Sequence, residues 1–316
     1  MKQITLIIAL VLSACLVSGN APYYDLQTMV NEALNGGTVL VPCGVYDIGT
    51  VYINAVDDWQ KVVTIQGCGH AHLGQSPAQN STQWDYLIDR GYVYGTVLRG
   101  SIVVDKGATA GNASSKLFLR DVSLIGYGSG IAIDYGDGTN MYPEGAIENV
   151  SIGNYDIGIR LRRVYYVSIT DVSMAGVGIG LQNIDSNVIT VTGLNIMSCG
   201  IGLDAGGSGN SYIGGSVQGC ANGVKLGGFA AVFGGYYFEA ITGFSLDVPG
   251  RGHTITSNFY ASNSGQVRIT GHNNSLYTSE IVTPIVVSGN YNRVDLSAYG
   301  SCTDTGFKNL CTRLFP

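Results

Sequence analysis

Charged residues are scarce in this chain of 316 residues, at 12% of the total, where about a quarter is usual. The 22 acidic residues outnumber the 16 basic ones, for a net charge of −6, and the basic residues form no cluster. A chain without a basic patch lacks the electrostatic footprint of a protein that binds nucleic acid or an anionic membrane. We therefore expect neither as a partner.

A hydrophobic run long enough to cross a membrane is also missing. The apolar run at residues 4–12 follows a lysine and precedes small residues, which is the layout of a secretory signal and is too short for a membrane span. We expect residues 1–19 to be removed and the protein to be secreted. An alternative stays open, because Leu12-Ser13-Ala14-Cys15 resembles a bacterial lipobox. In that case the signal ends at residue 14, and Cys15 anchors the protein at the bacterial cell surface through a lipid.

Helical periodicity is absent from about residue 117 onward, and a pattern of strand type recurs there instead. Each copy is a first residue, usually glycine, followed by an apolar, a variable and an apolar residue. The copies begin at Gly130, Gly158, Gly178, Gly200, Gly223, Gly243, Gln266 and, more faintly, Pro284. A second alternating strand, such as Val172-Ser173-Met174, precedes most of them. Repeats of about 22 residues that hold short alternating strands indicate a solenoid of parallel coils about 4.8 Å apart.

Polar residues recur just before the strands of successive repeats. They are Asn187, Asn210, Asn274 and Asn292. Stacked coils place such side chains one above another, where their amides can bond backbone groups of the corners. We interpret these residues as a structural ladder and not as catalytic groups.

Two short strands in residues 36–49 are interrupted by Pro42 and Gly44, where a central sheet strand cannot spare a backbone donor. We interpret the interruption as a corner of the first coil. The segment Asp25–Leu34, followed by Gly36–Tyr46 with its Pro-x-Gly-x-Tyr turn, resembles the opening of the pectate-lyase-like superfamily. In that superfamily a short helix caps a β-helix.

This resemblance implies an all-β fold, a single right-handed parallel β-helix over residues 36–299, with a helical cap at 20–35 and a C-terminal tail at 300–316. The right hand also follows the rule for parallel crossovers. Gly235–Glu239 is similar to a segment of phage tailspikes. The superfamily includes polysaccharide lyases, glycoside hydrolases, tailspike depolymerases and non-catalytic adhesins, so the implied partner is an extended polysaccharide. Whether this chain is an enzyme or a non-catalytic surface protein stays open, as does self-association.

Six cysteines remain once Cys15 is set aside, and an even number in an exported chain indicates disulfides. The simplest pairing joins neighbours in the sequence: Cys43 with Cys68, Cys199 with Cys220, and Cys302 with Cys311. The first two pairs are 25 and 21 residues apart, about one coil, which brings their Cα atoms near the range that a disulfide needs. The alternative is a set of buried free thiols.

Signatures of two activities of the superfamily are missing. Of the Asn-Thr-Asp, Asp-Asp, Gly-His-Gly and Arg-Ile-Lys motifs of polygalacturonase-like members, only fragments such as Gly252-His253 occur. The Arg-x-Pro-x-x-Arg signature of pectate lyases is absent too, so both activities are disfavoured. No cofactor is evident, although a lyase would imply Ca²⁺. His70 and His72 lack an obvious third ligand in their loop, and we expect no metal there.

The repeat also predicts which side chains share an outward face. Counted from the first residue of each copy, the fourth position forms a column that contains Asp134, Arg162, Gln182, Asp204 and Asp247, and the second position adds Arg160, Lys225 and Arg268. Such a face of mixed charge suits a sugar chain, with carboxylates about 5 to 10 Å apart if it cleaves glycosides. An ordinary solvated face is the alternative.

The candidate catalytic residues are accordingly Asp134, Asp204 and Glu239. The candidate substrate-binding residues are Arg162, Arg160, Gln182, Asp247 and Phe238. Phe238 is included because it lies beside Glu239 in an aromatic segment, where sugar rings stack well. A plain corner position is the alternative for Glu239.

Overall fold

The computed structural model describes residues 23–33, 35–54, 61–70, 95–105, 115–136, 138, 144–258, 265–278, 284–296 and 301–313. The signal region, Cys15 and His72 lie outside the described residues, so the expectations that depend on them stay predictions. No helix in these ranges is long and apolar enough to cross a membrane.

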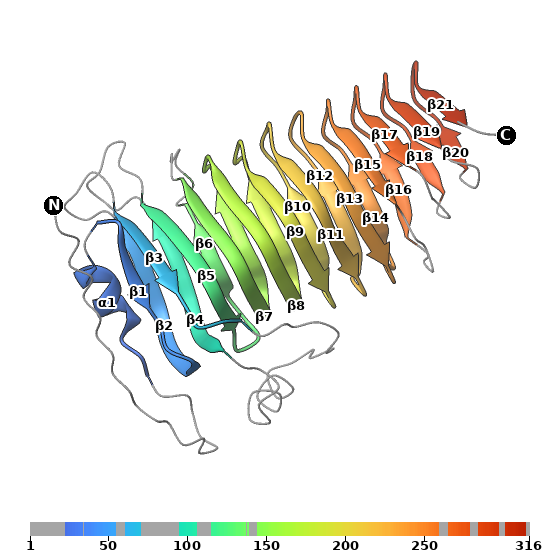
Figure 1. Ribbon diagram of the computed structural model, residues 1–316. Helices are drawn as coiled ribbons and strands as arrows, with labels where there is room; N and C mark the ends of the chain where they lie inside the picture. The colour runs from blue at the N-terminus through green and yellow to red at the C-terminus, as the bar shows by residue number, and fades with distance from the viewer. Residues whose placement is uncertain are drawn as a thin grey trace.

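The described part of the chain consists of one helix and a long stack of strands (Figure 1). The helix, α1, spans Leu26–Glu32. The strands are β1 (Gly37–Leu40), β2 (Gly44–Asn54), β3 (Val62–Gln66), β4 (Thr96–Asp105), β5 (Lys116–Ile125), β6 (Ile131–Tyr135), β7 (Gly145–Arg162), β8 (Val167–Ile184), β9 (Thr190–Met197), β10 (Ile201–Ala205), β11 (Ser211–Gln218), β12 (Asn222–Leu226), β13 (Val232–Glu239), β14 (Phe244–Val248), β15 (Thr254–Asn258), β16 (Gln266–Ile269), β17 (Ser275–Thr278), β18 (Ile285–Val287), β19 (Arg293–Leu296), β20 (Cys302–Asp304) and β21 (Leu310–Arg313).

The strands pair in parallel, each with its equivalent in the next coil. A complete coil contributes to three sheets, which we name sheet I, sheet II and sheet III. In the coil that begins at β8, residues 167–170 belong to sheet I, 172–175 to sheet II and 179–184 to sheet III. The first two segments pair with β9 and the third pairs with β10. The predicted all-β stack of parallel coils is confirmed for the described residues.

The corner between sheets I and II requires a left-handed backbone. Each residue at this corner has a positive φ: Asp121, Asn149, Asp171, Gly193, Gly214 and Gly235. Glycine adopts this conformation without strain, and Asn and Asp tolerate it better than other residues do. The abundance of these residue types in the repeat is therefore a consequence of the corners.

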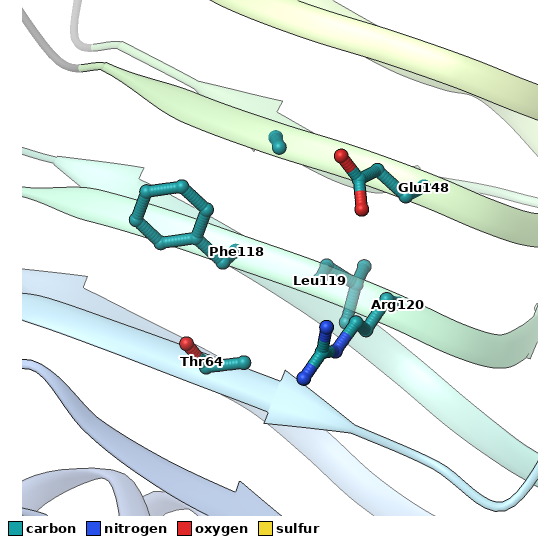
Figure 2. Close-up of a pocket in the computed structure, with 6 residues that line it drawn as sticks. Thr64, Phe118, Leu119, Arg120 and Glu148 are labelled. Carbon is teal, nitrogen blue, oxygen red and sulfur yellow. The ribbon is translucent and has the colours of Figure 1, made fainter.

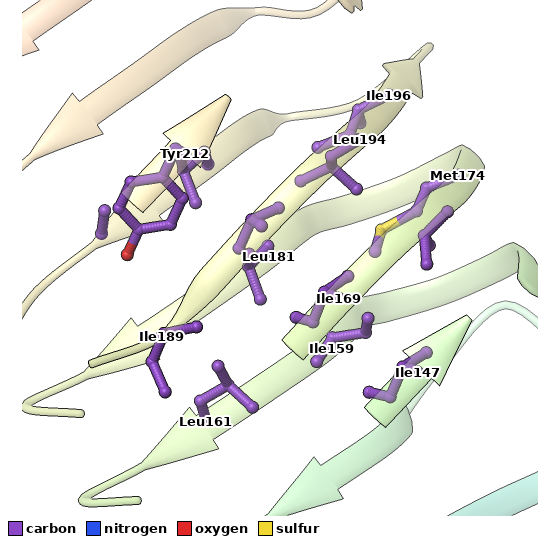
Figure 3. Close-up of a cluster of buried hydrophobic side chains, with 14 of the residues drawn as sticks. Ile147, Ile159, Leu161, Ile169, Met174, Leu181, Ile189, Leu194, Ile196 and Tyr212 are labelled. Atoms are coloured by element: carbon purple, nitrogen blue, oxygen red, sulfur yellow. The ribbon is translucent and has the colours of Figure 1, made fainter. Parts of the chain in front are cut away.

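Apolar side chains fill the interior of the coils in aligned rows. Figure 3 shows one stretch, in which Ile147, Ile169 and Ile159 lie among Leu181, Leu194 and Ile196. Ile147 and Ile169 are direct partners in the register of β7 and β8. Since every coil repeats the same inward positions, the core is continuous along the solenoid axis.

The asparagine ladder lies at the corner between sheets III and I. Oδ1 of Asn210 accepts a hydrogen bond from the backbone N–H of Ile189, one coil earlier, at 2.9 Å. Asn274 and Asn292 accept from His253 and Asn274 in the same way, at 3.0 and 2.9 Å. Asn187 instead accepts from Ser208 in the following coil, at 2.6 Å. The structural interpretation of these four residues is confirmed.

The ladder also shows how the coils shorten toward the C-terminus. Its steps are 21 residues from Ile189 to Asn210, then 21 from His253 to Asn274. The next two are 18 residues to Asn292 and 17 to Asn309. Strands described in these last coils belong to sheets I and III alone.

The N-terminal end of the solenoid is capped by α1, as predicted. Asp25 begins the helix by accepting a hydrogen bond from the N–H of Thr28 at 3.0 Å, and Leu26 and Val30 are buried. The side chain of Gln27 bonds both the N–H and the C=O of Tyr52 in β2. The helix therefore satisfies backbone groups at the first coil that no earlier coil can pair.

All three predicted disulfides are present, with Cα–Cα distances of 5.4 Å for Cys43–Cys68, 4.4 Å for Cys199–Cys220 and 6.4 Å for Cys302–Cys311. The predicted end of the solenoid at residue 299 is wrong, however. β20 pairs with β18, and β21 pairs with β19, so the expected tail at 300–316 contains the strands of a further coil. The sequence obscured this coil because it is shorter than the repeat.

Candidate functional site

The outward face of sheet III carries a column of charged and polar side chains. Its members, in successive coils, are Asp134, Arg160, Gln182, Asp204, Lys225, Asp247 and Arg268. We call this set the sheet III column. Side chains alternate along each strand, so the column residues point outward, while the preceding residues in the same strands, such as Leu203 and Val224, face the core. Acidic and basic residues follow one another in most steps.

The predicted column was correct in its face but wrong in its register. Asp134 lies opposite Arg160 and not Arg162, and Arg162 lies opposite Ile184. The error arose because several coils carry glycine at two positions two residues apart, such as Gly178 and Gly180. Gly158 stands opposite Gly180, whereas the repeat aligns it with Gly178.

Ion pairs link neighbours along the sheet III column. Arg160 donates to both oxygens of Asp134, at 3.0 and 2.6 Å, and Arg162 donates to Oδ2 at 3.1 Å. The hydrogen bond with Asp134 raises the pKa of Arg160. Further along, Lys225 lies 3.5 Å from Asp204.

A matching pair closes the column, where Arg268 lies 3.1 Å from Asp247 and over the ring of Phe244. Lys225 and Arg268 belong to the outward face that the repeat predicts, but they are not among the candidate site residues. In the sequence, each is marked by an acidic residue one coil earlier, Asp204 for Lys225 and Asp247 for Arg268.

The candidate catalytic carboxylates are not brought together. Asp134 and Asp204 are three coil steps apart in the column, or about 14 Å at the usual strand spacing. Asp204 and Asp247 are two steps apart, about 10 Å, and Lys225 lies between them. Paired carboxylates of glycosidases lie about 5 to 9.5 Å apart, so the spacing of Asp134 and Asp204 exceeds this range and that of Asp204 and Asp247 is at its upper limit.

Glu239 lies apart from the column, at the end of β13 in sheet II. Its Oε2 accepts a hydrogen bond from the hydroxyl of Tyr237 at 3.2 Å. The prediction that Phe238 contacts a ligand is wrong, because its side chain is fully buried and packs near Phe233 and Tyr236. Alternation along β13 sends Phe238 inward and Glu239 outward.

A shallow hollow lies on the outward face of sheet I, near the N-terminal end (Figure 2). It is lined by Thr64 of β3, by Phe118, Leu119 and Arg120 of β5, and by Ala146 and Glu148 of β7. The small side chain of Ala146 leaves the space beside Phe118. Arg120 is held at its rim by a 2.8 Å hydrogen bond to Gln66. The hollow is far less extended than the sheet III column.

Metal-ligating groups do not cluster in the part of the chain that the structure describes. No group of three or more His, Cys, Asp or Glu side chains there is placed to hold a metal ion. His253, which the sequence singled out in the Gly-His fragment, is buried in the asparagine ladder, where its Nδ1 accepts from the N–H of Ala231 at 3.0 Å. Its place is structural.

Comparison with known proteins supports the fold. No family model and no curated protein matches the chain. Among solved structures, it is similar to DFA-IIIase from Arthrobacter chlorophenolicus A6, with a TM-score of 0.50 and 12% identity over 94% of this chain and 85% of that one. The same enzyme without its lid gives a TM-score of 0.50 and 12% identity over 92% and 88%. The receptor-binding domain of the siphovirus 9NA tailspike covers 92% of this chain and 74% of its own at 11% identity, but its TM-score is only 0.30.

Proposed function

We propose that the protein is a secreted, right-handed parallel β-helix of the pectate-lyase-like type that holds an extended polysaccharide against sheet III without cleaving it. The handedness rests on the crossover rule for parallel strands and on the resemblance of residues 25–46. The sheet III column carries the proposal, because it repeats polar groups at every coil step along the solenoid.

The ion pairs favour binding by fixing the side chains in place. A guanidinium that already bonds a carboxylate loses little further freedom when it donates to a sugar hydroxyl. Arg160 and Arg162 keep 24% and 28% of their side-chain surface exposed, and Lys225 keeps 44%. Each therefore presents donors to solvent as well as to its acidic partner.

The spacing of the carboxylates favours binding over cleavage. Asp134, Asp204 and Asp247 are each engaged by a cation, and Asp134 and Asp204, the two candidate catalytic residues in the column, lie about 14 Å apart, farther than the acid and base of a glycosidase. A glycoside hydrolase or a polysaccharide lyase is the catalytic alternative. It would need a site away from the column, and Glu239 is the candidate catalytic residue that lies there.

Secretion is supported by the three disulfides, which persist in oxidising compartments. The lipid anchor at Cys15 is the alternative form of the same extracellular placement.

The test uses a panel of plant, algal and bacterial polysaccharides. We expect the wild-type protein to be retarded by at least one of them in affinity electrophoresis, and Lys225→Ala to weaken that binding several-fold. Lys116→Ala is the matched control, since Lys116 also pairs with one carboxylate, Glu144 at 3.0 Å, but lies on sheet I.

Equal loss in both variants, or no loss in either, would remove the sheet III column from the site. Reducing-end release or absorbance of unsaturated sugars with the same panel would replace the binding proposal by the catalytic one.

A further inference from the structure

Sheet I departs from its own repeat at the hollow beside Phe118. In the coils on either side, the position of Phe118 is held by small or hydroxyl side chains: Thr38, Thr64, Ala146, Ser168 and Thr190. Arg120 and Glu148 share a second outward column, whose next members are the uncharged Thr170 and Thr192. Stacked coils repeat their surface unless something selects against it, and departures from a protein's own pattern are expected at functional sites.

Phe118 forms a platform beside a gap in the side chains. Figure 2 shows its ring on the outward side of β5 with one face open to solvent, while Leu119 lies behind the strand, on the core side. Its register partner in β7 is Ala146, and its partner in β3 is Thr64, so short side chains border the ring on both neighbouring strands. The face of an aromatic ring is electron-rich. It therefore attracts the polarised C–H groups of a sugar ring.

Arg120 and Glu148 lie opposite each other at the rim of the hollow and do not pair. They are register partners on β5 and β7, yet Nη2 of Arg120 donates to Oε1 of Gln66, one coil earlier, at 2.8 Å. Within the described residues, the carboxylate of Glu148 makes no hydrogen bond and no ion pair, and both side chains are exposed. A guanidinium has further N–H donors beyond the one that Gln66 uses. The rim thus offers a hydrogen-bond acceptor and donors on adjacent strands, next to an aromatic face.

We propose that this hollow binds a single neutral sugar ring, which stacks on Phe118 while its hydroxyl groups donate to Glu148 and accept from Arg120. A purely apolar ligand would desolvate both charged groups without giving them partners. A charged sugar would meet one unfavourable charge at the rim, whereas the two charges balance for a neutral one.

The extent of the hollow argues for one ring and not for a chain. Its lining residues come from three strands, β3, β5 and β7. In the next two coils, neither of the two columns continues the aromatic platform or the charged rim. The hollow lies on a different sheet from the sheet III column, so the inference goes beyond the proposed function and does not depend on it.

The test uses saturation-transfer NMR with the methyl glycosides of glucose, galactose, mannose and N-acetylglucosamine at millimolar concentration. Phe118→Ala removes the platform, and Ala146→Leu fills the gap while leaving Phe118, Arg120 and Glu148 in place. Phe118→Tyr keeps an aromatic ring, and Ala146→Ser introduces the residue type that the next coil has at this position. Tyr277→Ala is the matched control for the loss of an aromatic side chain, since Tyr277 is an exposed aromatic residue in the column of Glu148.

We expect the wild-type protein to transfer saturation to at least one of the four sugars. The transfer should fall several-fold in Phe118→Ala and Ala146→Leu and persist in Phe118→Tyr, Ala146→Ser and Tyr277→Ala. A second readout is the methyl signal of Ala146 in protein labelled with ¹³C at alanine, which should shift as the bound sugar is titrated.

Two results would overturn the proposal. One is the absence of transfer from the wild type to any of the four sugars, and the other is transfer that survives both Phe118→Ala and Ala146→Leu at the wild-type level. Retardation by polysaccharides is a separate measurement, so a failure of the sheet III proposal would leave this result unaffected.

Discussion

His253 is expected to make the protein sensitive to mild acid. The side chain is 1% exposed, and its Nδ1 accepts the N–H of Ala231, so its Nε2 carries the proton of the neutral ring. Nε2 has no hydrogen-bond partner. A second proton would sit on Nδ1, facing the N–H of Ala231, and would place a charge inside the corner. Burial accordingly lowers the pKa of His253 from 6.5 to about 4.

The direction of the effect on stability follows from these two pKa values. Above pH 6.5 the ring is neutral in both the folded and the unfolded chain, and the free energy of unfolding does not depend on it. As the pH falls from 6.5 toward 4, the unfolded chain takes up the proton first, and the folded state loses stability. At about 1.4 kcal/mol for each pH unit, the total loss is about 3 kcal/mol.

Replacing His253 with asparagine should remove this loss without disturbing the ladder. Asn210 shows the geometry: its Oδ1 accepts from the earlier coil, and its Nδ2 donates to the C=O of Ser186 at 3.0 Å. For an asparagine at 253, the equivalent acceptor is the C=O of Gly228. Ser186, Gly207 and Gly228 stack in successive coils, since a Cβ on Gly228 would meet the backbone of Gly207 and one on Gly207 would meet the backbone of Ser186.

The assay is urea unfolding followed by circular dichroism at pH 7 and at pH 4.5, for the wild type, His253→Asn and His272→Asn. His272 is an exposed histidine one coil later, so its replacement controls for the loss of a histidine as such. We expect the wild type and the control to lose about 2 to 3 kcal/mol more than His253→Asn between the two pH values. Parallel losses in all three proteins would refute the reasoning, because buried His253 would then not govern the acid response.

Two further predictions concern links between coils. Removing the Cys199–Cys220 disulfide by a double change to alanine should lower the free energy of unfolding by about 3 kcal/mol, because the bridge closes a loop of 21 residues. Thiol titration of the denatured, unreduced wild-type protein should find none of the six cysteines free. A full set of thiols would contradict the pairing. Asp134→Ala should lower the free energy of unfolding by about 2 kcal/mol, because Arg160 and Arg162 then face each other without their shared carboxylate. An equal effect from Lys116→Ala, which removes only a surface pair, would argue against that cause.

The parts of the fold that repeat could be predicted from the sequence. The coil period and the pairing of Cys199 with Cys220 follow from a repeat of about 22 residues, and the corner at Pro42 follows from the interruption of two short strands by Pro42 and Gly44. The last coil could not be found in this way, because the 17-residue step to Asn309 departs from that period. Shorter coils leave fewer positions for the repeated pattern.

The candidate site was predicted less well, for two separate reasons. The aromatic neighbours of Phe238 favour a ligand surface, although alternation with Glu239 indicates that the two side chains point to opposite sides. The alternation along the strand is the more reliable of the two indications, because it alone states which side chain faces the core. Arg162 was assigned to the column of Asp134 because alternation cannot distinguish it from Arg160, which also points outward. Only the pairing of strands separates those two arginines.

Slips of two residues are the hardest errors for a solenoid to exclude, because the alternation of its side chains has a period of two. A slip of one residue would turn Leu203 outward and Asp204 into the core, and burial alone forbids it. A slip of two keeps every apolar side chain inside. It would, however, place Gly223 or Gly227 instead of Lys225 opposite Asp204 and move Asn210 away from the backbone of the earlier coil. Ion pairs on an exposed face add little stability one by one. Arranged in a column, they distinguish the native register from the slip that hydrophobic burial leaves open, and this selection does not depend on whether sheet III binds a ligand.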